Sequence, residues 1–126
     1  MAISQINVSS PTNEIIFNDS AIGNVADGVK SSSTLIYSVT VDNSANGSAV
    51  YLKLFNLASG SVVAGTTSPD EILYIPGSSV VTRVYFTGAT PGVTFSTALS
   101  AICVTSGGTA GSTSPSSNVS ATINYK

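Results

Sequence analysis

The sequence predicts an all-β fold, an antiparallel two-sheet sandwich of seven to eight strands and of the jelly-roll or immunoglobulin-like type. Apolar and polar residues alternate with a period of two along most of the chain, and no window of about a dozen residues has helical apolar spacing. Turn-forming stretches separate these segments at the intervals that are typical of sandwiches. The 126 residues also include 23 Ser and 14 Thr, which fit the polar positions of strands.

The length predicts one domain, residues 1–126, with residues 1–12 as an N-terminal arm that carries Ile3 and Ile6. A chain of this size can bury an adequate core without disulfides or metals. The first ten residues lack the pattern of a secretory signal, and no apolar stretch approaches the roughly 18 residues that a membrane-spanning helix needs. We therefore expect neither a signal peptide nor a membrane partner.

The first half of the chain predicts a short strand and a hairpin. Residues 14–17 read as the short strand, and residues 18–33 as a long loop. In Thr34–Asp42 the alternation places Leu35, Tyr37, Val39 and Val41 on one face and the four residues between and after them on the other. The following NSANGS segment, in which Asn46-Gly47 tolerates positive φ, predicts a hairpin with a second strand at residues 49–57.

The second half predicts four further strands. A loop over residues 58–69 precedes Glu71–Ile75, and Pro76-Gly77 then predicts a hairpin with residues 79–87. Residues 97–105 form the next predicted strand, and the run SGGTAGSTSPSS reads as a flexible loop with little to bury. Residues 118–125 alternate so regularly that we expect them to pair inside a sheet and to order the C-terminus.

The composition argues against catalysis and against nucleic acid as a partner. The chain has no His, and only 8% of its residues are charged. Four scattered cations, Lys30, Lys53, Arg83 and Lys126, cannot form the basic stripe that displaces phosphate counterions. Asp70 and Glu71 are adjacent on an extended segment, where neighbours point to opposite faces, so we expect that they do not flank one scissile bond. The sequence predicts a protein that is not an enzyme.

No cofactor or metal is predicted either. Asp19 and Asp27 in the long loop could ligate calcium, but the spacing of an EF-hand is absent and two acids are too few. Cys103 has no second Cys and no His to form a metal site or an activated nucleophile. We therefore expect Cys103 to be a small buried hydrophobic residue.

Two predicted strands carry a cation flanked by apolar or aromatic residues. Tyr51, Lys53 and Phe55 share one face of residues 49–57, while Arg83 and Tyr85 share a face of residues 79–87. If these faces point outward, they are candidate interface surfaces, because interface cores favour such groupings. In the alternative, both faces are buried and the protein's own loops surround Lys53 and Arg83.

Residues 50–125 resemble small β-sandwich virion proteins of tailed bacteriophages. The resemblance is carried by VYLKLFN, by GTTSPDEILYIP, by VYFTGATPGVTFSTALSAICVT and by the closing NVSATINY, in that order. The chain departs from the commoner form at Ala98, where a glycine often stands. The residues before this region match no pattern of the family.

The resemblance implies a non-enzymatic structural protein. Its most direct form is a capsid decoration or cement protein on the exterior of a phage head, which stands as a homotrimer and binds the major capsid protein. The resemblance also includes minor tail proteins, so attachment to the tail is a second possibility. The alternative is a carbohydrate-binding or adhesin domain of a phage fibre or tail, which would use exposed aromatic residues near Asn and Asp.

Overall fold

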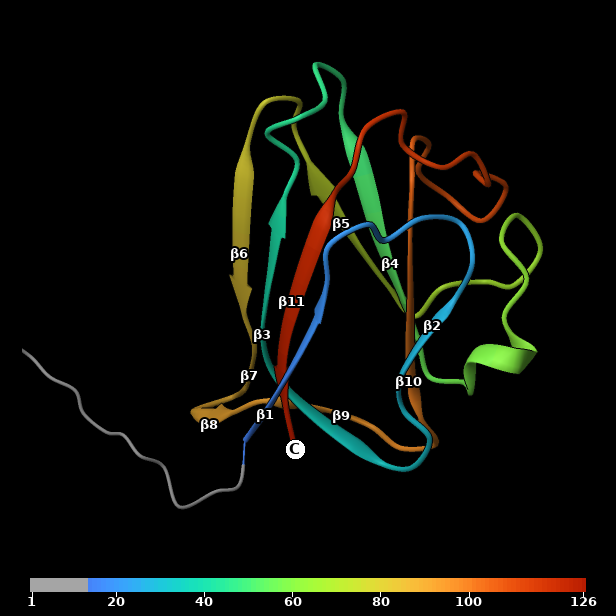
Figure 1. Ribbon diagram of the computed structural model, residues 1–126. Coiled ribbons are helices and arrows are strands. Elements are labelled where there is room, and N and C mark those ends of the chain that lie inside the picture. The colour runs from blue at the N-terminus through green and yellow to red at the C-terminus, as the bar shows by residue number, and fades with distance from the viewer. Residues whose placement is uncertain (1–13) are drawn as a thin grey trace, which may run out of the picture.

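The computed structural model describes residues 14–126, which form two antiparallel sheets packed face to face (Figure 1). Sheet A has the strand order β1-β11-β3-β6, and sheet B has the order β2-β10-β4-β5. The strands of sheet A are β1 (Ile15–Asp19), β11 (Ser120–Tyr125), β3 (Thr34–Asp42) and β6 (Val80–Val84). Those of sheet B are β2 (Asp27–Lys30), β10 (Leu99–Val104), β4 (Val50–Phe55) and β5 (Glu71–Ile75). The predicted all-β sandwich is confirmed, while the predicted arm lies outside the described residues.

The pairing of these eight strands is that of a jelly roll. The first strand, β1, pairs with the last, β11, and inside this pair β2 meets β10, β3 meets β6 and β4 meets β5. Such nested pairing arises when one long hairpin is rolled up, and the immunoglobulin-like order does not have it. As predicted, β11 pairs inside its sheet, between β1 and β3.

The segment that pairs with β3 on its outer side is interrupted, so that it forms two strands, β6 and β9, instead of one. After β6 the chain forms a small two-stranded ribbon of β7 (Phe86–Thr87) and β8 (Thr90–Pro91), and then β9 (Val93–Phe95) resumes the pairing with β3. In Figure 1 this ribbon projects from the lower edge of sheet A. A single 3-10 turn, η1 (Ser59–Ser61), is the only helical element of the described residues.

Both predicted hairpins are wrong. β3 belongs to sheet A and β4 to sheet B, so the connection through residues 43–49 crosses between the sheets. The Pro76-Gly77 connection likewise crosses from β5 in sheet B to β6 in sheet A. Alternation shows that a strand has one buried face, but it does not show which strand lies beside it. The structure also adds β2, which falls inside the predicted long loop.

The predicted facing of β3 is wrong in its first half. Ile36 is fully buried together with Val39 and Val41, whereas Leu35 and Tyr37 are only half-buried. The pairing with β11 shifts register here, because Asn124 lies opposite Ser38 but Tyr125 lies opposite Ile36. Such a β-bulge adds one residue to the strand and changes the face that the alternation predicts.

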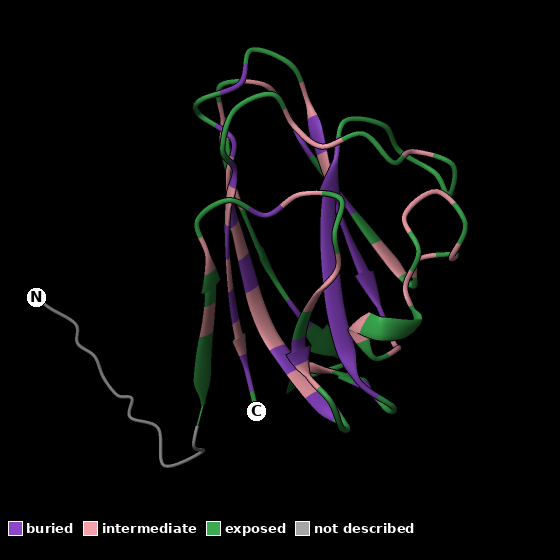
Figure 2. Cartoon of the chain, turned by 45° about the vertical axis from the view of Figure 1, so that its right-hand side comes forward, coloured by how far each residue is buried: buried purple, intermediate pink, exposed green. Residues whose placement is uncertain are grey.

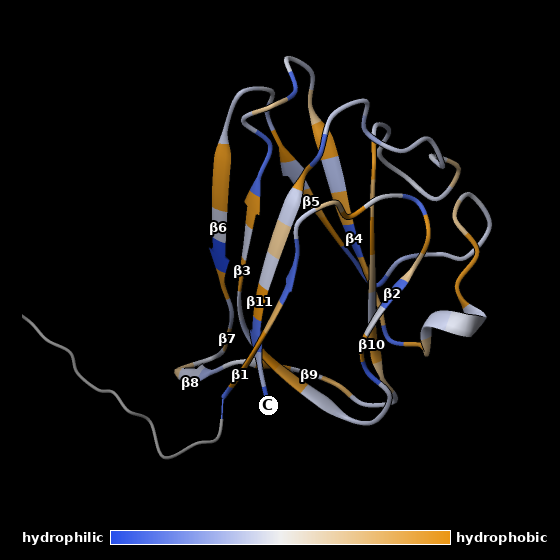
Figure 3. Ribbon diagram, in the orientation of Figure 1, coloured by the Kyte–Doolittle hydropathy of each residue, from blue (hydrophilic) through white to orange (hydrophobic). Residues whose placement is uncertain are grey.

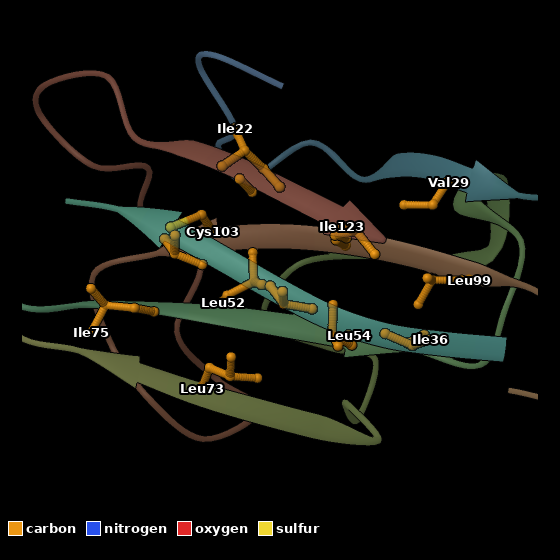
Figure 4. Packing of buried hydrophobic residues seen from close by; sticks show 14 of the residues in the cluster. Ile22, Val29, Ile36, Leu52, Leu54, Leu73, Ile75, Leu99, Cys103 and Ile123 are labelled. Atoms are coloured by element: carbon orange, nitrogen blue, oxygen red, sulfur yellow. The ribbon is translucent and has the colours of Figure 1, made fainter. Parts of the chain in front are cut away.

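The core lies between the two sheets (Figure 4). It is built from Val, Leu, Ile and Ala side chains with Cys103, and most of them are fully buried. Ile22 from the loop after β1 also points into it (Figure 4). Each fully buried Leu or Ile side chain contributes about 1.5–3 kcal/mol of transfer free energy.

Candidate interaction site

Two long loops of the chain itself cover the outer face of sheet B. The loops of residues 56–70 and 105–119 lie on this side of the sandwich (Figure 1). Beneath them Phe55, Ile102 and Val104 are fully buried and form a second apolar cluster with Ala26, Leu57, Val62 and Ala64. Sheet B therefore has a packed layer on each face.

Lys53 lies under the second of these loops. It is 1% exposed, and its Nζ donates a hydrogen bond of 3.1 Å to the carbonyl oxygen of Gly111. Burial lowers the pKa of its ammonium group. The loop that was predicted to have little to bury thus covers the one fully buried cation among the described residues.

The predicted interface on β4 is therefore wrong for Lys53 and Phe55, because neither is accessible to a partner. Tyr51 is half-buried, and its ring packs against that of Tyr74 with 5.4 Å between the ring centroids. The alternative, that the chain covers this face with its own loops, is confirmed for β4. The loops are rich in Gly, Ala and Ser, and small side chains allow them to lie close to the sheet.

The predicted facing of β6 is inverted. Arg83 lies opposite Val39 and Val81 opposite Val41, so these residues point to the inner side of sheet A. Tyr85 is only 9% exposed and belongs to the core cluster, which excludes it as a free contact residue. The outward positions hold Val80, Thr82 and Val84 instead.

Arg83 and Tyr85 close one open side of the sandwich. Arg83 Nη1 lies 3.1 Å from Glu71 Oε2 on the edge strand of sheet B, and the Tyr85 hydroxyl donates to the same oxygen at 3.4 Å. Burial, together with the Glu71 charge, raises the pKa of Tyr85. This pairing joins β6 to β5 across the gap between the sheets.

A hollow of about 220 Å³ lies beside this contact, and we call it the β5–β6 hollow. It is lined by Asn56, Asp70, Glu71, Tyr85, Val93, Thr94 and Phe95. Asp70 and Glu71 therefore share one hollow, against the expectation that they point apart, because Asp70 precedes β5 rather than belonging to it. Asp70 Oδ2 accepts the backbone N–H of Asn56 at 2.7 Å.

No loop of residues 14–126 covers the outer face of sheet A in this way, and we call this face the open face. Its residues are set by the registers of β1, β11, β3 and β6. They are Ile16, Asn18, Ser38, Thr40, Asp42, Val80, Thr82, Val84, Ser120, Thr122 and Asn124. Of these only Asp42 is charged.

Polar residues fill the middle of the open face. Asn18, Thr122, Thr40 and Thr82 lie side by side in one row across all four strands. The hydroxyls of Thr40 and Thr82 are 2.9 Å apart, and Thr122 donates to Asn18 Oδ1 at 3.1 Å. These hydrogen bonds hold the row in place without any formal charge.

Apolar residues lie at the two edges of the open face. Ile16 on β1 is 68% exposed, while Val80 and Val84 on β6 are each 57% exposed. Phe86, the first residue of β7, is 58% exposed. Figure 2 shows the exposed edges beside the buried central strands, and Figure 3 shows the hydrophobic residues of β6. The period-two pattern already contained these positions, but it did not show that they form one surface.

Cys103 is fully buried in the core, and burial raises the pKa of its thiol to about 12. The prediction that it is a small hydrophobic residue is confirmed. Among residues 14–126 no three His, Cys, Asp or Glu side chains gather as a metal site would require. No helix of the described chain is long and apolar enough to cross a membrane.

Neither a known family model, nor a curated protein, nor a solved structure matches this chain. No relative therefore supplies a function, and a candidate function has to be inferred from the surfaces of the chain. Within residues 14–126, the open face with its two apolar edges is the larger uncovered surface, and Ile72 and Tyr74 on the outer side of β5 are also exposed. The open face replaces the β4 face as the candidate interaction site.

Proposed function

We propose that this protein is a non-enzymatic structural protein of a virion, a decoration or cement protein that stabilises the head of a tailed phage. The virion assignment starts from the sequence resemblance of residues 50–125. The partner is then the major capsid protein, and the location is the capsid exterior. The open face of sheet A is the surface that contacts the capsid.

The observation that carries this proposal is the difference between the two outer faces. On one face the chain's own loops cover β10 and β4, although Ile72 and Tyr74 of β5 stay exposed there. The other face has no such cover among the described residues and combines a neutral polar middle with exposed Ile16, Val80 and Val84 at its edges and Phe86 nearby. Exposed apolar residues grouped around one face are typical of protein interaction sites. Contacts built from apolar area and neutral hydrogen bonds are screened little by salt, which suits a particle that meets changing ionic strength.

We further propose a homotrimer as the form that binds. β6 is an edge strand with exposed valines and no Pro, and its one charged side chain, Arg83, is on the inner side of sheet A and pairs with Glu71. Natural proteins rarely leave an edge with exposed apolar residues uncovered. Ile3 and Ile6 of the N-terminal arm are additional proposed contacts. Sedimentation of the purified protein tests this part, and a monomer at all concentrations would contradict it.

Binding to the capsid is tested by cosedimentation with phage heads that lack the protein. Thr82→Lys places a charge in the middle of the open face, where Thr82 is exposed and supports no core contact. We expect it to weaken binding by at least about tenfold, since a buried unpaired charge costs more than 1.4 kcal/mol. Wild-type binding should persist at about 1 M salt.

The matched control is Thr109→Lys, which makes the same change at an exposed position in the loop over sheet B. This variant should bind as the wild type does. Equal loss in both variants, or no loss in either, would show that the open face is not the capsid contact.

The second candidate function is carbohydrate binding, and the β5–β6 hollow favours it. A hollow of about 220 Å³ that is lined by the carboxylates of Asp70 and Glu71 and the amide of Asn56 can bind sugar hydroxyls. The test is a thermal-shift panel of neutral sugars with the wild type and Asp70→Asn. Stabilisation that Asp70→Asn abolishes and Asp42→Asn retains would favour this candidate.

A further inference from the structure

The second open side of the sandwich, between β1 and β2, is bridged by two acids. Asp19 on the edge of sheet A lies opposite Ala121, and Asp27 on the edge of sheet B lies opposite Ala101. Both alanines are fully buried. Both carboxyl groups therefore point toward the space between the sheets, where they meet.

The two carboxyl groups interact directly. Asp27 forms a side-chain hydrogen bond with Asp19. The buried Oδ2 atom of Asp27 has no hydrogen-bond partner among the described residues. Asp19 Oδ1 also accepts the backbone N–H of Ala21 at 2.8 Å. Two carboxylates cannot donate to each other, so this hydrogen bond requires a proton on one of them.

No Lys or Arg of the described residues lines the hollow around this pair. The hollow around it, about 270 Å³, is lined by Asp19, Ala21, Gly23, Asn24, Val25, Asp27 and Ser114, so the two acids are its only titratable groups. β10 contributes only the backbone N–H of Cys103, which donates to the carbonyl of Gly23. Burial, followed by the hydrogen bond and charge of Asp19, raises the pKa of Asp27 to about 7.

The pair lies at the base of the loop that ties β1 to the covering layer. Asn24 donates its backbone N–H to Ser114 Oγ at 2.9 Å and its side-chain amide to the carbonyl of Ser112 at 2.8 Å. The segment that it holds continues from Gly111, which accepts from Lys53. A change at the acid pair thus reaches the loop that covers sheet B.

We propose that Asp19 and Asp27 form a proton-operated latch. A proton shared between the two carboxyl groups holds the β1–β2 side closed. When the pH rises and the proton is lost, two adjacent carboxylates repel each other and the Asp27 oxygen needs water. Residues 20–26 then open and release their contacts with residues 112–114. The opposite side of the sandwich does not respond in this way, because Arg83 and Glu71 carry opposite charges.

The sign of the pH dependence follows from the direction of the pKa shift. The folded-state pKa of Asp27 lies above its unfolded value of 3.8. Stability from this pair is fully present below about pH 4 and is lost as the pH rises toward about 7. Asp27→Asn should remove this loss, because its amide donates to the Asp19 carboxylate at every pH.

Amide hydrogen exchange measured by NMR tests the latch. We expect the protection of residues 20–26 and 112–114 in the wild type to fall at least about tenfold between about pH 5 and pH 8, after correction for intrinsic exchange. Asp27→Asn should keep its protection over this range. The matched control, Asp42→Asn, should behave as the wild type, because hydrogen bonds from Ser44 lower the pKa of Asp42 and it stays ionised throughout.

Three results would overturn the latch. One is the same loss of protection in Asp27→Asn as in the wild type. Another is a titration of the Asp27 carboxyl carbon near pH 4. The third is protection of residues 20–26 and 112–114 in the wild type that stays the same between about pH 5 and pH 8. None of these results depends on capsid binding.

Discussion

Asn46 has a structural role that its local sequence does not predict, because its side chain links two loops. The Asn-Gly pair predicts a turn with positive φ, yet neither residue has it. Instead Asn46 is 7% exposed, and its side chain joins two loops. Its amide donates to Asn43 Oδ1 and to the carbonyl of Ser117, and its Oδ1 accepts the backbone N–H of Ser117 at 2.9 Å.

Asn46→Ala should therefore destabilise the protein by about 2–4 kcal/mol, because it leaves several buried polar groups without partners. Guanidinium denaturation followed by tyrosine fluorescence measures the change in the free energy of unfolding. Asn124→Ala on the half-exposed open face is the control and should cost less than about 1 kcal/mol. Equal losses in the two variants would contradict the role of Asn46.

Lys53 is a candidate interface residue in the sequence and is buried under a loop in the structure, so it offers a second test at this scale. Lys53→Met keeps the apolar stem and removes a buried charge, so its stability should equal or exceed that of the wild type. Lys53→Ala should lose about 2 kcal/mol, since it also removes the packed methylenes. A large loss in Lys53→Met would show that the hydrogen bond to Gly111 outweighs the cost of burying the charge.

The lowered pKa of Lys53 also sets a pH dependence. Because the folded-state pKa lies below the unfolded value of 10.5, the wild type gains stability from this group as the pH rises toward that value. Lys53→Met should lack this gain. The measurement is the free energy of unfolding of both proteins at about pH 7 and pH 10. The difference between their pH dependences isolates the contribution of Lys53 from that of the other titrating groups.

At the scale of elements, the connections between strands determine which sheet each strand belongs to, and the strand patterns do not show this. The loops of residues 43–49 and 76–79 run from one sheet to the other and meet at the same end of the sandwich. A Cβ on Gly77 would lie 2.2 Å from the carbonyl oxygen of Gly47, so the two connections touch through their backbones. The alternation of apolar and polar residues predicted most strand positions. It did not predict this backbone contact between the two connections, because the contact depends on the path of both connections between the sheets.

Gly77→Ala should consequently destabilise the protein by about 2–4 kcal/mol, because backbone rather than a flexible side chain must move. Gly60→Ala is the matched control, since nothing lies within 4 Å of its added Cβ. It should be neutral or slightly stabilising. Thermal unfolding of both variants distinguishes a steric effect from a general intolerance of glycine replacement.

At the scale of the whole molecule, the jelly-roll pairing makes almost every strand contact non-local. β1 begins at Ile15, which lies opposite Tyr125, so the two ends of the described chain must meet before the β1 edge of sheet A is complete. Loop closure of this length costs entropy before the contacts repay it. The arrangement favours slow folding.

We expect refolding in water on the order of seconds, as is typical of two-sheet β proteins with non-local pairing. Stopped-flow tyrosine fluorescence measures it, because the chain has five Tyr and no Trp. Refolding within about a millisecond would contradict the inference that non-local pairing limits the rate.

The sequence by itself determined the fold class, most strand positions and the burial of Cys103, because alternation and turn residues are local signals. It also supplied the neutral composition on which the proposed interaction surface depends. Only the tertiary structure decided the strand partners, the inverted facing of β6 and the covering of Lys53 and Phe55. The reason is that the pattern of a strand shows which of its faces is buried. It does not show which segment covers that face, because the covering segment can lie far away in the sequence.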